Sequence, residues 1–160
     1  MERVDRILQN KKFRKHVKKN KKWEKDRIFC RHDLVHFLDV ARIAWILALE
    51  EGIPIEKEIV YGAALLHDIG RHVQYKDGTP HEAASALLAP EILEECGFTA
   101  EETDRIVEAI RRHRDKTVAE EANLNGILYR ADKASRACFV CEAEELCSWK
   151  KGKKNIQIKY

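Results

Sequence analysis

The stretch from Ala63 to Arg71, Ala-Ala-Leu-Leu-His-Asp-Ile-Gly-Arg, limits the possible folds of this chain more than any other segment. A run of small and apolar residues ends abruptly in a histidine, a carboxylate and a glycine. Helical spacing places Ala63 and Leu66 on one buried stripe. His67 and Asp68 come next around the helix, and a buried carboxylate is costly unless it is paired or binds a cation. The stretch therefore predicts either a hydrogen-bonded His-Asp pair in a helical core or a metal site.

The end of this helix is expected to favour a cation. The pattern predicts a helix from about residue 55 to 69, so that His67 and Asp68 stand in its last turn. Unpaired carbonyls there give the helix end a partial negative charge. Gly70 is expected just past the helix, in the left-handed backbone conformation that glycine adopts at little cost. A polar loop is expected to follow at residues 74–78.

Four other expected helices each bring one more metal-binding side chain inward. The helix at residues 34–49 carries His36, and the helix at residues 123–147 carries Asp132. A third helix opens with capping-box spacing at Thr79 and Glu82 and has His81 in its first turn. The fourth opens with a second such box at Thr99 and Glu102 and carries His113. One such side chain alone is more often a core residue with a hydrogen-bond partner. Burying four imidazoles and two carboxylates without a shared cation is expensive. The set, which includes His67 and Asp68, suffices for one or two divalent transition metal ions, and its chemistry suits Fe, Mn, Co or Zn.

The rest of the chain is typical of a single all-α domain, a helical bundle of 160 residues. Only the tail at residues 156–158 alternates like a strand. We expect three parts: residues 1–27 as a basic N-terminal helix packed on the domain, residues 28–136 as a metal-binding core, and residues 137–160 as a Cys-containing C-terminal extension. No segment approaches the roughly 20 apolar residues of a membrane span, so no membrane partner is expected. A lysine-rich start without an apolar core and an odd count of five cysteines favour the reducing cytoplasm.

The charge of the chain is distributed unevenly. Residues 1–27 hold 12 Lys/Arg and 4 Asp/Glu, a balance of +8, whereas residues 28–149 carry a balance of −10. The last 11 residues add five lysines. The basic segments Lys11–Lys25 and Lys150–Lys154 are candidates for binding a polyanion such as RNA or an acidic membrane surface. The alternative is a solvated helix face, and the lack of interleaved aromatic residues favours it, so a nucleic-acid partner is possible but not favoured.

Three of the cysteines stand close together near the C-terminus. Cys138, Cys141 and Cys147 fall within ten residues, and with Cys30 they are candidate ligands for zinc or an iron–sulfur cluster. Cys138 and Cys141 also have the spacing of neighbours on a helix, where free cysteine packs as a small apolar residue. We favour the packing interpretation, and Cys96 has no evident partner.

The order of the candidate ligands resembles that of the HD-domain metal-dependent phosphohydrolase superfamily, an all-helical fold. His36 lies in His-Phe-Leu-Asp-Val-Ala, which is similar to the helix of the family's first histidine. Leu-Leu-His67-Asp68-Ile-Gly resembles its namesake motif, and Tyr-Arg-Ala-Asp132-Lys133 resembles its final aspartate. The resemblance covers roughly residues 28–136.

The resemblance implies a centre with two metals. His81 and His113 match the two extra histidines of the dinuclear branches, such as the bacterial diadenosine tetraphosphatases and the HD-GYP phosphodiesterases. In those branches the aspartate of the His-Asp pair bridges both ions, which gives that role to Asp68. The chain lacks the Gly-Tyr-Pro signature, and Arg71 and His72 stand where guanosine tetraphosphate hydrolases and mononuclear deoxynucleotidases carry acidic residues.

The implied activity is that of a metal-dependent phosphohydrolase. It would cleave a phosphoester or phosphoanhydride of a nucleotide, dinucleotide or related small molecule. The candidate catalytic residues are Asp68 at the metals, with Arg71 and Lys133 as groups that bind phosphate oxygens. The alternative is a non-catalytic metal-containing sensor, or a module that binds RNA or a partner through its basic terminal segments. The sequence does not identify the exact substrate, the native metal or the oligomeric state, and it is compatible with a homo-oligomer.

The remaining histidines are assigned smaller roles. His32 stands one turn before His36 and is expected to orient it as a hydrogen-bond partner. His16 and His72 are expected to be plain surface residues.

Overall fold

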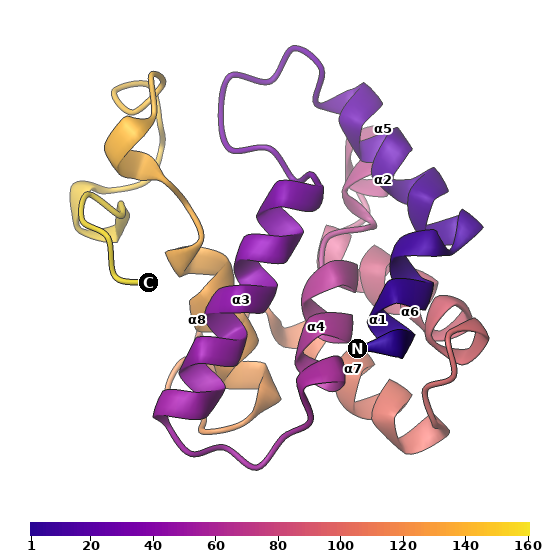
Figure 1. The fold of residues 1–160 in the computed structure, drawn as a ribbon. Helices are drawn as coiled ribbons and strands as arrows, with labels where there is room; N and C mark the ends of the chain where they lie inside the picture. Colours follow the sequence, from indigo (N-terminus) through magenta and orange to yellow (C-terminus); the bar gives the residue numbers. More distant parts are fainter.

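The chain forms eight α-helices and three short 3₁₀ turns in a computed structural model that describes all residues 1–160 (Figure 1). The helices are α1 (Glu2–Gln9), α2 (Lys11–Trp23), α3 (Leu34–Glu50), α4 (Lys57–Leu66), α5 (Arg71–Asp77), α6 (His81–Glu95), α7 (Ala100–Arg112) and α8 (Leu124–Ala134), and the 3₁₀ turns are η1 (Lys116–Val118), η2 (Cys138–Val140) and η3 (Lys151–Lys153). No strand is present, which confirms the predicted all-α class, and the alternating tail at residues 156–158 does not form one. None of the helices combines the length and hydropathy needed to cross a bilayer.

Helix α3 is the central element of the bundle. It packs against α4 on one side and α8 on the other, as Figure 1 shows. Its side chains Phe37, Val40 and Ala44 are fully buried, because both flanks of the helix are covered by neighbours. The Asp33 side chain accepts hydrogen bonds from the backbone amides of Val35 and His36 and so caps the helix start.

The segment after α4 differs from its prediction. The helix ends at Leu66, and the chain turns sharply before α5 begins at Arg71, so the expected polar loop is mostly helical. Gly70 has a φ of −84°, not the expected left-handed value. It is glycine for a steric reason, since a Cβ there would lie 2.5 Å from the backbone nitrogen of Ser85 on α6. Helix α5 itself ends at Gly78, which has a left-handed φ of 82°.

The basic N-terminal segment is two helices rather than one. The break falls at Asn10, whose side chain accepts from the backbone amides of Lys12 and Phe13 and caps the second helix. Ile7 and Phe13 are buried in the core cluster, so both helices pack against the rest of the chain.

Two helix starts were predicted as capping boxes, and only one forms. At α7 the Thr99 side chain and Glu102 complete the reciprocal hydrogen bonds, which confirms that box. At α6 the helix begins at His81 after Pro80, and Thr79 bonds to Asp77 instead. His81 is nevertheless in the first turn, as expected.

The last long helix is much shorter than expected. Helix α8 ends at Ala134 rather than near residue 147. The side-chain amide of Asn155 donates to the carbonyls of Lys133 at 2.6 Å, Ala134 at 3.1 Å and Arg136 at 3.0 Å, and so satisfies carbonyls at the helix end. The residues beyond α8 follow an irregular path at the edge of the molecule, where Figure 1 shows them in yellow and orange.

Candidate metal centre

The six side chains predicted as metal ligands meet where α3, α6, α7 and α8 surround the end of α4. They form two groups whose candidate ligand atoms lie within 4.8 Å of one another: His36, His67, Asp68 and Asp132, and then Asp68, His81 and His113. Asp68 belongs to both groups. All but His36 are buried, and His36 is half-buried.

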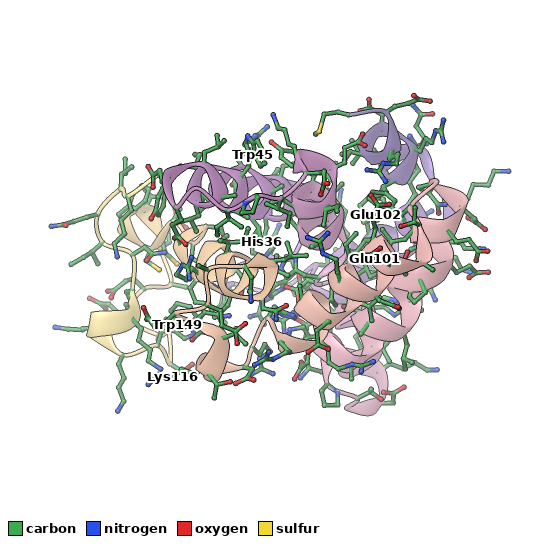
Figure 2. The ribbon with its side chains drawn as sticks, turned by 90° about the horizontal axis from the view of Figure 1, so that it is seen from below. His36, Trp45, Glu101, Glu102, Lys116 and Trp149 are labelled. Atoms are coloured by element: carbon green, nitrogen blue, oxygen red, sulfur yellow. The ribbon has the colours of Figure 1, made fainter.

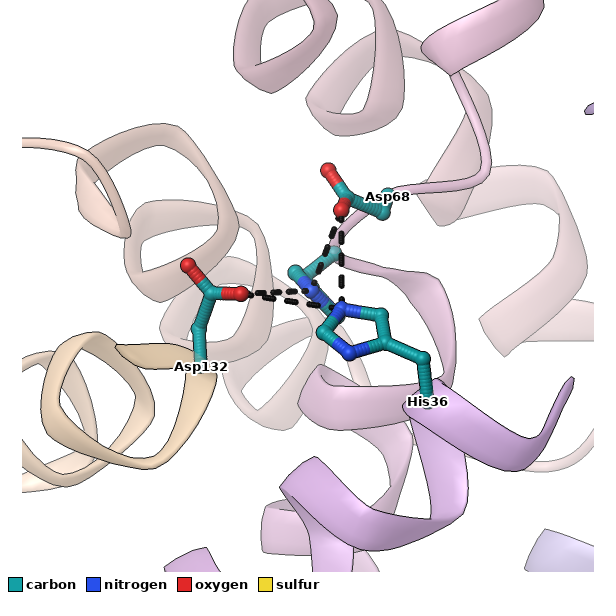
Figure 3. A group of neighbouring side chains, drawn as sticks. His36, Asp68 and Asp132 are labelled. Carbon is teal, nitrogen blue, oxygen red and sulfur yellow. Dashed lines mark ion pairs between the residues drawn. The ribbon is translucent and has the colours of Figure 1, made fainter. Parts of the chain in front are cut away.

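The first group places two imidazoles between two carboxylates. The Nε2 atom of His36 lies 3.8 Å from Asp68 Oδ2 and 3.6 Å from Asp132 Oδ1 (Figure 3). The Nε2 atom of His67 lies 3.4 Å and 3.8 Å from the same two oxygens. Each of these gaps is too long for a good hydrogen bond and leaves both nitrogens facing one shared point.

The second group uses the other oxygen of Asp68. His81 Nε2 lies 3.0 Å from Asp68 Oδ1, and His113 Nε2 lies 3.7 Å from it. The two Nε2 atoms are 3.2 Å apart. Asp68 therefore presents Oδ2 to the first group and Oδ1 to the second.

All four imidazoles have an oxygen acceptor beside Nδ1. The acceptors are the backbone carbonyl of Ala64 for His67 at 2.6 Å, the carbonyl of Ile110 for His113 at 2.6 Å, the amide oxygen of Gln74 for His81 at 2.7 Å, and the hydroxyl of Ser135 for His36 at 3.3 Å. These acceptors favour a proton on Nδ1, although Nη1 of Arg71 also lies 3.2 Å from His81 Nδ1, and a neutral ring protonated at Nδ1 has a lone pair on Nε2. Metal-binding histidines are oriented in the same way.

Three atoms of the centre are buried without a hydrogen-bond partner: Nε2 of His36, Nε2 of His67 and Oδ1 of Asp68. Buried polar atoms are nearly always paired, so unpaired atoms that face one another need an explanation. A divalent cation in the first group would satisfy the two nitrogens, and a cation in the second group would satisfy Oδ1 of Asp68. The residues present therefore fit a metal of the class that prefers imidazole and carboxylate ligands.

The charges at the centre attract positive charge. Burial raises the pKa of Asp68, but the neighbouring His67, His32 and Arg71 outweigh it and hold the pKa well below its usual range. Burial lowers the pKa of His67, but Asp68 and Asp132 more than offset this and raise it to about 9. The pKa of Asp68 is lowered by the positive groups around it, and the pKa of His67 is raised by the two carboxylates beside it.

His32 does not have the predicted partner. Its Nδ1 donates to Glu24 Oε1 at 2.5 Å, and its Nε2 accepts from the Arg71 guanidinium at 2.6 Å. Its ring meets the His36 ring edge-on without a hydrogen bond between them. Arg71 Nε lies 3.5 Å from Asp68 Oδ1. The chain from Glu24 through His32 thus orients the Arg71 guanidinium beside the centre.

Lys133 contacts a candidate metal ligand directly. Its Nζ donates to Asp132 Oδ2 at 2.8 Å and to the carbonyl of His113 at 2.9 Å. Arg136, which sequence reasoning missed, lies with its guanidinium 3.4 Å from Asp132 Oδ1. Its position four residues after Asp132 was the available signal, because that spacing places both on one helical face.

Asn20 on α2 was also missed. It is fully buried, its amide nitrogen donates to the carbonyl of Asp68 at 2.9 Å, and its amide oxygen accepts from the backbone amide of His72 at 2.9 Å. The signal in the sequence was helical spacing, since Asn20 and Glu24 continue the stripe of Phe13 and Val17.

The expectation that His16 and His72 are plain surface residues is wrong. His72 is buried and His16 is half-buried. Their rings stack with centroids 5.1 Å apart, and His16 Nδ1 lies 2.8 Å from His72 Nε2. The pair lies between α2 and α5, which pack against each other.

The cysteines of the C-terminal segment are half-buried free thiols. Neither group of candidate metal ligands contains a cysteine. Cys138 lies in a short 3₁₀ turn rather than on the expected helix, so its spacing to Cys141 is not that of α-helical neighbours.

A cavity of about 930 Å³ opens beside the centre. The candidate ligands Asp68, His81, His113 and Asp132 line its inner end, together with Arg71 and Lys133. Its volume is in the range of small-molecule sites. A substrate in this cavity would therefore meet both groups of candidate ligands.

Residues 34–147 match the family described as "HD domain". The chain is 46% identical to a protein of Clostridium beijerinckii, named "Uncharacterized protein", over the whole length of both. No solved structure matches.

Proposed function

This chain belongs to the HD-domain family, and we propose that it is a phosphohydrolase acting on a nucleotide, dinucleotide or related small phosphoester. Proteins of this superfamily are generally metal-dependent hydrolases. The observation that carries the proposal is the convergence of four imidazole Nε2 atoms on two buried carboxylates at the end of a cavity.

The same observation supports a centre for two ions. His36, His67, Asp68 and Asp132 would hold one divalent metal, and Asp68, His81 and His113 the other. The two oxygens of Asp68 face different groups, which supports a bridging role for this carboxylate. Fe, Mn, Co or Zn suit these ligands.

The protein's own groups would bind and orient the substrate. When bound, the ions would supply charge stabilisation at a phosphoryl oxygen and acidify a water molecule. Arg71 lines the cavity, and its buried Nε has no hydrogen-bond acceptor, so it is available to a phosphate oxygen. Lys133 neutralises the outer oxygen of Asp132 and keeps that carboxylate in place.

We also propose that residues 1–160 form one functional domain. The family match begins at residue 34, yet Asn20, Glu24 and His32 lie before it and bond to the Asp68 backbone or orient Arg71. The basic N-terminal segment is therefore part of the support of the centre, although all of its lysines except Lys12 are exposed.

Elemental analysis tests the number of metals. We expect two ions per fully loaded chain, one after His81→Ala or His113→Ala, and none after Asp68→Ala. His16→Ala removes a histidine outside the centre and should leave the metal content unchanged. One ion per wild-type chain that persists in both histidine variants would refute the two-metal proposal.

A substrate panel tests the activity. Phosphomonoesters, cyclic dinucleotides and diadenosine polyphosphates would be assayed with Mn, Fe or Co. Hydrolysis of at least one class, lost in Asp68→Ala, is expected. The absence of turnover by metal-loaded protein would contradict the proposal and favour a non-catalytic sensor.

A further inference from the structure

The outer wall of the cavity is built by the C-terminal segment, residues 148–160. These residues follow the end of the family match at residue 147. They line the cavity with four lysines and two aromatic side chains, namely Lys150, Lys153, Lys154, Lys159, Trp149 and Tyr160. A substrate that reaches the metal centre through this cavity would pass along this wall.

The segment is anchored to the elements that carry the centre. Asn155 holds the end of α8, immediately after Asp132, through three hydrogen bonds. The Lys154 ammonium donates to the carbonyl of Glu144 at 2.6 Å and to its carboxylate at 2.5 Å. The Arg136 guanidinium lies over the Trp149 ring at 4.7 Å from its centroid. These contacts place the wall at a fixed position relative to Asp132.

Four lysines of the cavity have no carboxylate within ion-pair distance. They are Lys150, Lys153 and Lys159 on the C-terminal wall and Lys116 on η1. In Figure 2, Lys116 and Trp149 lie near one another on one side of the molecule. By contrast, Lys133 and Lys154 are paired with carboxylates. Unpaired charges of one sign in a concave site concentrate ligands of the opposite sign.

The aromatic side chains of the cavity indicate which class of anion would bind beside the unpaired lysines. Tyr129, Trp149 and Tyr160 line the same cavity as the unpaired lysines. Aromatic rings next to cationic groups are the usual platform for a nucleobase, because every base presents a π-face. A ligand with one base and several phosphates would use both features at once.

We propose that residues 148–160 are the specificity element of this enzyme and select nucleotides that carry several consecutive phosphates over nucleoside monophosphates. The inference rests on the proposed function, since the metal centre and the wall share one cavity. Lys150, Lys153 and Lys159 bind the phosphates that are distant from the centre. Trp149 stacks on the base.

The test measures the binding of non-hydrolysable phosphonate analogues of AMP, ADP and ATP to the Mn-loaded full chain. In the wild type, affinity rises with the number of phosphates. The triple variant Lys150→Ala, Lys153→Ala, Lys159→Ala should weaken binding of the ATP analogue about tenfold or more, which is ~1.4 kcal/mol. Binding of the AMP analogue should change less than about threefold, which is below ~0.7 kcal/mol.

Two further variants make the result specific. The control is a triple variant of α2 with the substitutions Lys15→Ala, Lys18→Ala and Lys22→Ala, which removes the same charge from exposed positions outside the cavity. It should change the affinity for the AMP analogue and for the ATP analogue by no more than about threefold. Trp149→Ala should weaken the ATP analogue about tenfold while leaving inorganic tripolyphosphate bound as before.

Three results would overturn the inference. The first is an equal loss of affinity for the AMP and ATP analogues in the triple lysine variant of the cavity. The second is an equal loss of affinity for the ATP analogue in the α2 variant. The third is tighter binding of a single-stranded oligonucleotide than of the ATP analogue at equal charge. Because the analogues are not cleaved, the outcome does not depend on turnover. A protein that hydrolyses nothing but still shows the lysine-dependent selectivity would refute only the proposed activity.

Discussion

The buried amide of Asn20 allows a quantitative test of how the N-terminal helix supports the centre. In Asn20→Ala the backbone amide of His72, which lies in the first turn of α5, loses its only acceptor. An unsatisfied buried donor costs about 1–3 kcal/mol, and the lost bond to the Asp68 carbonyl adds about 1 kcal/mol. The Asp68 carbonyl keeps a second donor, the amide of Arg71 at 3.1 Å. We therefore expect a loss of unfolding free energy of about 2–4 kcal/mol.

Urea unfolding in the presence of EDTA measures this loss without any contribution from bound metal. Lys21→Ala, an exposed substitution on the same helix, is the matched control and should stay within about 0.5 kcal/mol of the wild type. A loss below about 0.5 kcal/mol in Asn20→Ala would refute the assignment, because a surface substitution has the same effect.

Two further predictions concern packing and pH. Gly70→Ala places a Cβ 2.5 Å from the Ser85 backbone nitrogen and should lower the unfolding free energy by about 2 kcal/mol or more. Gly152→Ala is the control, because open space surrounds that residue, and it should not lower the unfolding free energy. Equal thermal stability of the two variants would contradict the steric argument. Burial lowers the pKa of His16 to about 4 and also lowers that of His72. Unfolded histidine takes up its proton near pH 6.5, so stability should be full above that pH and fall as the pH drops towards 4, by about 1–2 kcal/mol for a partly exposed ring. Urea unfolding at pH 7 and pH 4.5 checks this, and His16→Gln should reduce the dependence.

Local sequence signals were sufficient for most helices and for the candidate ligands. The apolar period of 3.6 residues located the helix around residues 34–49, and the box of Thr99 and Glu102 located the start of α7. The same period placed His36 and His113 on inward faces, which the structure confirms by bringing their Nε2 atoms to the carboxylates of Asp132 and Asp68. These features depend on spacing within one segment, which the sequence contains directly.

Features that depend on partners far along the chain were not predictable in this way. Helix α8 stops at Ala134, where Asn155, about twenty residues later, bonds to its last carbonyls. Gly70 is required by the backbone of α6 rather than by its own φ.

The sequence alone determined an all-α chain with six metal-capable side chains in a characteristic order, because helical periodicity and residue chemistry are local properties. Only the tertiary structure decided that Asp68 presents one oxygen to each group of histidines and that Asn20 holds its backbone. It also decided that the C-terminal lysines face the centre across one cavity. Those outcomes depend on the distances between separate helices, which are set by the packing of the whole core.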